Sequence, residues 1–217
     1  MTFTKSATRL LLIASLALGG ASAALSEGSV AHTHMGHVTE SWADTPDAQG
    51  LLPTAIAEAK IAIFHAGLAA QKLDDLGWMK THANHVLHAI DPSAIANGPG
   101  LGYGVLAAAT GVAKHIGFAA AADDASDNVK THAVHVATSA NNTVARVAAI
   151  KANIATIEAA TTAAEAAGPT QANVALTTAL LEGVDANGDG AVDWTEGEGG
   201  LNEALKHMGI MAAGESM

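Results

Sequence analysis

The chain of 217 residues contains no cysteine, and only 3% of its residues are aromatic. Without cysteine it has no disulfide, no thiolate metal site and no covalent attachment of c-type haem. The scarcity of aromatic side chains leaves few large residues for a core. Cohesion must then come from closely packed small residues. The abundance of alanine favours helices, because alanine loses no side-chain entropy on folding.

Positive charge is also scarce, since 10 lysines and arginines face 21 aspartates and glutamates, a net charge of −11. Lys5 and Arg9 precede the apolar run Leu10–Leu18 and the small residues Ala21-Ser22-Ala23. This order is typical of a cleaved signal peptide, so we expect residues 1–23 to direct export to the periplasm or beyond. Cleavage removes two cations and no acid, which leaves a net charge near −13. Such a charge argues against nucleic acids and anionic membranes as partners.

Turn formers and helical periodicity divide the rest of the chain. Residues 24–50 are expected to be a flexible leader, 51–168 a helical bundle and 169–217 a separate C-terminal segment. None of them contains an apolar run long enough to predict a membrane span. The predicted helices cover residues 54–71, 76–90, 105–122, 126–141 and 144–168, and Gly168-Pro169 is the expected stop of the last one.

A duplication lies inside the predicted bundle. The phrase KTHANH at residues 80–85 returns as KTHAVH at residues 130–135. Three histidines keep the same formula, His-x16-His-x2-His, in both copies: His65, His82, His85 and, fifty residues later, His115, His132, His135. A repeat of this length predicts a duplicated helical hairpin. We therefore expect an all-α fold, in which two duplicated hairpins and a fifth helix form a bundle.

The repeated histidines are candidate ligands. In an antiparallel hairpin that turns near residue 74, His65 lies level with His82 and His85. The same geometry predicts that His115 meets His132 and His135. Three imidazoles with an open position suit zinc or copper. The six histidines can make two mononuclear sites, one binuclear site, or axial pairs for non-covalent haem b.

The helical periodicity also offers a simpler interpretation. The apolar stripe of the predicted helix 76–90 runs through Met79 and Val86, and His82 and His85 flank it. The histidines can therefore be a solvated row on a helix face, or ligands in a groove beside the core. His88 and His207 have no repeat partner and are expected at the surface.

A second histidine cluster, HTHMGH, lies in the expected leader and contains His32, His34 and His37 around Met35. A flexible tail of this composition can capture copper or zinc. The alternative is a disordered polar leader that has no metal-binding role.

The stretch DANGDGAVDWTE at residues 185–196 resembles the calcium loop of the EF-hand family. The resemblance implies Ca²⁺ ligands from the side chains of Asp185, Asn187, Asp189, Asp193 and Glu196 and from the carbonyl of Ala191. It covers only this loop and its flanks. It also implies a C-terminal helix–loop–helix, although GEGG at 197–200 interrupts the exit helix, which is expected to resume at Leu201. No second such loop is present in the sequence, so we expect a structural calcium site.

These features predict an exported metal-binding protein that holds Ca²⁺ in the C-terminal loop and copper or zinc on the repeated histidines. Storage, capture or delivery of metal fits better than catalysis, because no paired nucleophile and base is visible. The alternatives are a periplasmic electron carrier with bis-histidine haem and an interaction module stabilised by calcium. A binuclear metal oxidase is disfavoured, because carboxylates and aromatic residues are sparse near the repeats.

Overall fold

A computed structural model describes residues 28–217. The expected signal peptide, residues 1–23, lies outside them. The described chain is helical and contains no strand, which confirms the all-α prediction. The elements are α1 (Val30–Thr39), the 3₁₀ turn η1 (Pro46–Ala48), α2 (Leu51–Ala69), α3 (Leu76–Ile90), α4 (Val105–Ala121), α5 (Asp127–Ala159), α6 (Ala163–Glu182) and α7 (Leu201–Glu215).

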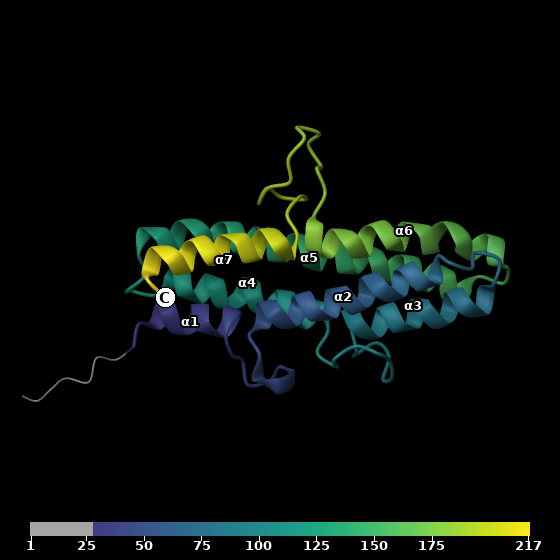
Figure 1. Ribbon diagram of the computed structural model, residues 1–217, viewed down its shortest axis with the longest axis horizontal. Helices are drawn as coiled ribbons and strands as arrows, with labels where there is room; N and C mark the ends of the chain where they lie inside the picture. The colour runs from purple at the N-terminus through teal and green to yellow at the C-terminus, as the bar shows by residue number, and fades with distance from the viewer. Residues whose placement is uncertain (1–27) are drawn as a thin grey trace, which may run out of the picture.

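The helices form one elongated bundle around α5, which runs along most of its length (Figure 1). At one end α1, α4 and α7 lie along the N-terminal half of α5. At the other end α2, α3 and α6 accompany its C-terminal half. Contacts of α2 with both α4 and α6 join the two ends. The long helix therefore connects two four-helix groups into a single packed unit.

Small residues make up much of the core, as the composition predicts. Four alanines of α2 are almost fully buried: Ala55, Ala59, Ala62 and Ala66. Larger side chains such as Met35, Met79, Ile150 and Leu180 fill the spaces between the alanine-lined surfaces. Because alanine extends only one carbon from the backbone, the helices can approach closely and compensate for the missing aromatic residues.

Residues 28–50 are not a flexible leader. Ala31, Met35 and Val38 of α1 are buried against the bundle, and α1 packs on α4. The Asp124 carboxylate accepts hydrogen bonds from the N–H groups of Val30 (2.8 Å) and Ala31 (3.2 Å). This contact satisfies two orphan donors at the start of α1. The carboxylate of Asp124, distant in the sequence, thus stabilises the start of α1, whose own apolar stripe is short.

The predicted helix stop at Gly168-Pro169 is wrong. The chain breaks earlier, where Ala160 becomes extended, and α6 begins at Ala163 and includes Pro169. Thr162 and Glu165 form a capping box at this start, which satisfies two helix-terminal donors reciprocally. This cap places Pro169 inside a helix. The expected domain boundary at 168/169 therefore falls within α6, which packs against α5.

One helix, α2, is long and apolar enough to cross a membrane by length and composition, although the sequence pattern predicts none. Half of its apolar window is buried inside the bundle. Glu58 lies near its middle and is also fully buried. These features are those of a central core helix.

Glu58 holds the glycine-rich linker between α3 and α4. Its carboxylate accepts hydrogen bonds from the backbone N–H groups of Leu101 (3.0 Å), Tyr103 (3.1 Å) and Gly104 (2.9 Å). Gly104 has a φ of 84°, a left-handed conformation that favours glycine. Nearby, His88 is buried and its Nδ1 accepts the N–H of Gly100 at 3.0 Å. The expectation that His88 lies at the surface is therefore wrong, because it anchors this linker.

Replacing Glu58 with alanine is expected to lower the free energy of unfolding by about 3 kcal/mol, because three buried N–H groups lose their charged acceptor. Urea denaturation followed by circular dichroism measures this loss. Glu158→Ala removes an exposed carboxylate from α5 and should change stability by less than about 0.5 kcal/mol. Equal effects of the two substitutions would contradict the anchoring role of Glu58.

Candidate metal centres

Nine of the histidines come together in three groups of three. In each group the three ring nitrogens lie within 4.8 Å of one another. We call them the N-terminal triad (His34, His37, His115), the middle triad (His65, His82, His85) and the C-terminal triad (His132, His135, His207). Each triad combines an i, i+3 pair from one helix with a single histidine from the helix that packs beside it.

The middle triad joins the histidines that hairpin geometry predicts. His65 of α2 faces His82 and His85 of α3. Its Nδ1 lies 3.1 Å from Nδ1 of His82 and 3.2 Å from Nδ1 of His85. The tight turn at 70–75, which ends with the Asp75 cap on α3, sets this register. The i, i+3 spacing then brings both rings of α3 to the same point.

The prediction for the second copy is wrong, because His115, His132 and His135 do not form one group. His115 of α4 meets His34 and His37 of α1, at Nδ1–Nδ1 distances of 3.1 and 3.2 Å. His132 and His135 of α5 meet His207 of α7, at 2.9 and 3.2 Å. Packing of α1 on α4 and of α7 on α5 supplies nearer partners to each half of the second hairpin.

The sequence contains a signal for one of these added partners and none for the other. His34 and His37 have the same i, i+3 spacing as His82 and His85, so α1 plays the role of α3. His32, which the sequence grouped with them, lies outside the triad, and its Nε2 pairs with Glu215 at 3.1 Å. His207 is a single histidine without a spacing pattern. It was expected at the surface but is buried, and no local signal identifies its role.

Each triad contains more close contacts between Nδ1 atoms than ordinary hydrogen bonds account for. Nδ1 of a neutral imidazole carries either one proton or one lone pair. Yet Nδ1 of His65, His115 and His207 each faces two other Nδ1 atoms at hydrogen-bond distance. Three lone pairs directed at one point are the donor set of a metal ion, which imidazole nitrogens bind at about 2.0–2.1 Å. A fourth position stays open.

The burial of the triad histidines distinguishes them from a solvated row on a helix face. His65, His82, His115 and His207 are buried, and the other five triad histidines are half-buried. The interpretation of the repeated histidines as a solvated row therefore fails for His65, His82 and His115. Each triad lies beside the core, close enough to the surface for an ion to enter without unfolding of the bundle.

The surroundings favour the neutral, metal-binding form of the histidine that is central to each triad. Burial, reinforced by the neighbouring His85 and His82, lowers the pKa of His65 to about 4. Burial also lowers the pKa of His115, with further contributions from His37, His34 and Lys114. The pKa of His207 is lowered by burial too, although Glu203 opposes the shift. Lone pairs are thus available at neutral pH.

All three tryptophans of the chain lie against triads, one at each. The Trp42 ring centroid is 4.5 Å from that of His115 and 4.9 Å from that of His37. Trp78 lies 4.3 Å from His82, and Trp194 stacks on His135 at 4.1 Å with an interplanar angle of 19°. Sequence reasoning missed these contacts, because the tryptophans occupy different positions relative to their histidines. Each indole covers one side of a triad and gives it a spectroscopic reporter.

Comparisons of the chain with protein-family models, curated proteins and solved structures find no match. Only the geometry of these sites therefore indicates a function, and the EF-hand resemblance stays a prediction.

The acidic loop 185–196 projects from the bundle between α6 and α7 (Figure 1). Asp185 accepts hydrogen bonds from the N–H groups of Gly188 (2.7 Å) and Gly190 (2.9 Å), so the loop folds around the first predicted ligand. Within residues 28–217 the groups of three donors close enough to share an ion are the histidine triads, and the loop is not among them. Helix α7 begins at Leu201, as expected.

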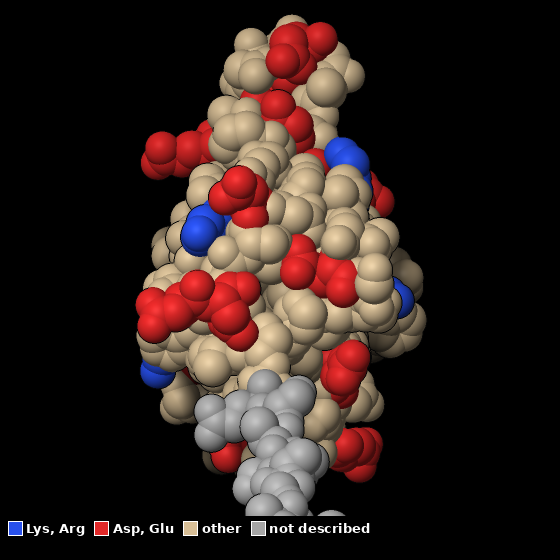
Figure 2. Space-filling view, turned by 90° about the vertical axis from the view of Figure 1, so that its left-hand side faces the viewer, with Lys and Arg blue, Asp and Glu red and all other residues tan. Residues whose placement is uncertain are grey.

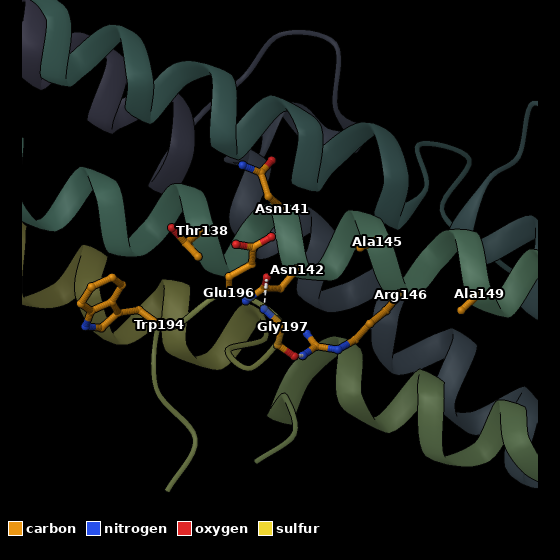
Figure 3. Close-up of a pocket in the computed structure, with 9 residues that line it drawn as sticks. All are labelled: Thr138, Asn141, Asn142, Ala145, Arg146, Ala149, Trp194, Glu196 and Gly197. Carbon is orange, nitrogen blue, oxygen red and sulfur yellow. Dashed lines mark hydrogen bonds between the residues drawn. The ribbon is translucent and has the colours of Figure 1, made fainter. Parts of the chain in front are cut away.

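The positions of two glutamates explain why the predicted calcium ligands do not come together in the loop. Glu196, the predicted twelfth-position ligand, lines a cavity of about 640 Å³ beside α5, together with Asn141 and Asn142 (Figure 3). Glu198 is buried instead, and its carboxylate accepts the N–H groups of Asn187 (3.2 Å) and Asp193 (3.3 Å). Calcium coordination by Glu196 requires that its side chain turn from α5 towards the loop.

Buried Arg146 fastens the exit of the loop to α5. Its guanidinium donates to the carbonyl oxygens of Gly197 (2.7 Å), Glu198 and Gly199 (2.9 Å). The loop is therefore anchored next to Trp194 and the C-terminal triad. Acidic side chains predominate over basic ones on the end of the bundle formed by α1 and α7 (Figure 2). Their field attracts cations to this region.

The stability of the metal-free protein should depend on pH through the triads. Between about pH 6.5 and 4 the unfolded chain protonates His65, whereas the folded chain keeps it neutral. The free energy of unfolding therefore falls as pH falls through this window and is fully retained above it. Urea denaturation between pH 7 and 4.5 should show a shallower fall for His65→Gln. Identical slopes for the two proteins would contradict the assignment.

Proposed function

We propose that this protein binds three transition-metal ions, one at each histidine triad, for storage, capture or delivery. The observation that carries the proposal is the convergence of nine Nδ1 atoms in three groups on three helix pairs. Neutral imidazoles suit copper and zinc, whereas calcium and magnesium prefer oxygen ligands. The three groups use different helices, which supports mononuclear sites.

Reversible binding fits the placement of the triads. Five of the nine ligand histidines are half-buried, so an ion can exchange with solvent at the edge of the bundle. Imidazole ligands must be deprotonated to bind metal, so such sites bind an ion at pH 7 and release it on acidification. The pattern of residues 1–23 supports a role after export, in the periplasm or outside the cell.

The triad geometry favours single ions over bis-histidine haem. Axial nitrogens of such a haem lie on opposite faces of the porphyrin, which must fit between them. Within the triads the facing nitrogens are 2.9–3.2 Å apart, which leaves no space for a macrocycle. An electron-carrier role through haem b would need both helices of a pair to separate.

A Ca²⁺ ion on the acidic loop is a second element of the proposal. Its support is the resemblance of residues 185–196 to an EF-hand loop. The ligands would be Asp185, Asn187, Asp189, Asp193, Glu196 and the carbonyl of Ala191. Such an ion would order the link between α6 and α7. A module that binds only this calcium is the competing function, and it predicts that the histidines take up no metal.

Metal stoichiometry tests the main proposal. Purified protein titrated with Cu⁺ under anaerobic conditions, then desalted and analysed for metal, should retain up to three ions per chain. Each of the substitutions His65→Ala, His115→Ala and His207→Ala should lower the maximum by one, because each removes the histidine shared by both contacts of its triad. His32→Gln, on α1 but outside the triads, is the control and should retain the wild-type number. Retention of metal in a triple variant would overturn the proposal.

The tryptophans allow each site to be observed separately. Bound copper, added as Cu⁺ under anaerobic conditions, quenches nearby indole fluorescence, and each triad has one indole whose ring centroid lies within 5 Å of a ligand ring. In a variant that keeps only Trp78, copper should quench most of the emission, and adding His65→Ala should abolish that quenching. Adding His115→Ala instead should leave it unchanged. Quenching that follows neither substitution would show that copper binds elsewhere.

A further inference from the structure

The three triads have the same donor atoms but differ in the residue that lies one helical turn before the single histidine of each. Four residues before that histidine, on the same helix face, stand Glu203 in α7, Ile61 in α2 and Gly111 in α4. The carboxylate is thus present at the C-terminal triad and replaced by apolar or absent side chains at the other two.

Glu203 contacts the ring nitrogen of His207 that does not face the triad. Its Oε1 lies 3.1 Å from Nε2 of His207, and the Glu203 side chain is buried. Nε2–H therefore donates to the carboxylate, which leaves Nδ1 with its lone pair directed at His132 and His135. A carboxylate in this position orients the ligand ring, raises its basicity and offsets the charge of a bound ion.

Charges around the other two triads have the opposite sign. Lys72 lies over the ring of Trp78 at 4.0 Å, and that ring contacts His82 of the middle triad. Lys114 lies 5.7 Å from the ring of Phe118, which contacts His34 and His115 of the N-terminal triad. The C-terminal triad also has a lysine, Lys206, but its Nζ pairs with Glu203 at 2.9 Å.

Coulomb repulsion from an unpaired lysine doubles when the bound ion carries two charges in place of one. A donor set of three neutral imidazoles supplies no charge to offset either. Within the described residues, no carboxylate is hydrogen-bonded to a histidine of the N-terminal or middle triad. These two triads therefore favour a univalent ion. At the C-terminal triad burial lowers the pKa of His135, whereas the carboxylates of Glu203 and Asp193 both act to raise it. Negative charge therefore remains there after Lys206 is offset.

We propose that Glu203 makes the C-terminal triad the divalent-metal site, for Zn²⁺ or Cu²⁺, and that the N-terminal and middle triads select Cu⁺. This inference rests on the proposed function and assigns different ions to its three sites. Glu203 is a positioning residue, since it acts through His207. The backbone also enforces part of the difference, because a Cβ at Gly111 would lie 2.8 Å from the side chain of Leu51. A carboxylate side chain at this position of α4 would therefore have to displace the buried side chain of Leu51.

The test compares Zn²⁺ with Cu⁺ in the same variants, by competition with chromophoric chelators and, for Cu⁺, under anaerobic conditions. Wild-type protein should bind one Zn²⁺ tightly and three Cu⁺. Glu203→Gln should weaken the Zn²⁺ site about 10- to 100-fold while three Cu⁺ still bind. Glu215→Gln removes the same charge from α7, away from the triads, and is the matched control with wild-type Zn²⁺ affinity.

A gain of function provides the reverse test. Ile61 is half-buried and stands where Glu203 stands in α7, so Ile61→Glu should give the middle triad a carboxylate and raise the number of tight Zn²⁺ ions to two. Circular dichroism and the retained Cu⁺ stoichiometry verify that this variant is folded. If it does not fold, Glu203→Gln decides alone.

The outcomes separate this inference from the proposed function. Three equally tight Zn²⁺ ions, or an unchanged Zn²⁺ affinity in Glu203→Gln, would overturn the assignment of ions and leave the three metal sites intact. Absence of both Zn²⁺ and Cu⁺ binding would overturn the proposed function itself. Loss of Zn²⁺ with retention of Cu⁺ in Glu203→Gln supports both.

Discussion

The candidate metal centres all depend on one contact, in which an i, i+3 pair of histidines on one helix faces a single histidine on its neighbour. It occurs three times, between α1 and α4, α2 and α3, and α5 and α7. Each occurrence gathers three lone pairs in partly desolvated surroundings, which has an energetic cost in the absence of an ion. The alanine-lined core and the buried carboxylate of Glu58 must hold the helices in register against that cost.

The division of the bundle around α5 explains why there are three triads. Its N-terminal half packs with α7 and carries one triad, while α4 and α1 carry another. At the other end α2 and α3 carry the third. The fourth helix pair, the C-terminal half of α5 with α6, contains no histidine and joins Asn153 to Asn173 by a hydrogen bond of 3.1 Å. The histidine pattern therefore follows helix pairs rather than the duplicated hairpin alone.

Sequence reasoning succeeded where the partners were close in the chain. The middle triad joins residues separated by one short turn, so helix periodicity and the turn position determine which rings meet. The other two triads join segments 81 and 75 residues apart, and only the packing of α1 and α7 determines those partners. Helix stops show the same limit, because the capping box at Thr162 overrode the breaking tendency of Pro169. Glu203 precedes His207 by four residues, a spacing that the sequence shows. Its role as a hydrogen-bond partner of His207 depends on the burial of both side chains, which the sequence does not show.

The separation of the ligands along the chain has a mechanical consequence in a protein that lacks cysteine. An ion in the N-terminal triad would tie α1 to α4, and one in the C-terminal triad would tie α5 to α7. Both ions would act as removable cross-links that close long loops, and the entropic stabilisation from such closures grows with loop length. The middle triad closes a loop of only 17 residues and would contribute less. Metal release would therefore loosen the first and last helices of the described chain most. Metal occupancy and the stability of the bundle would thus be coupled.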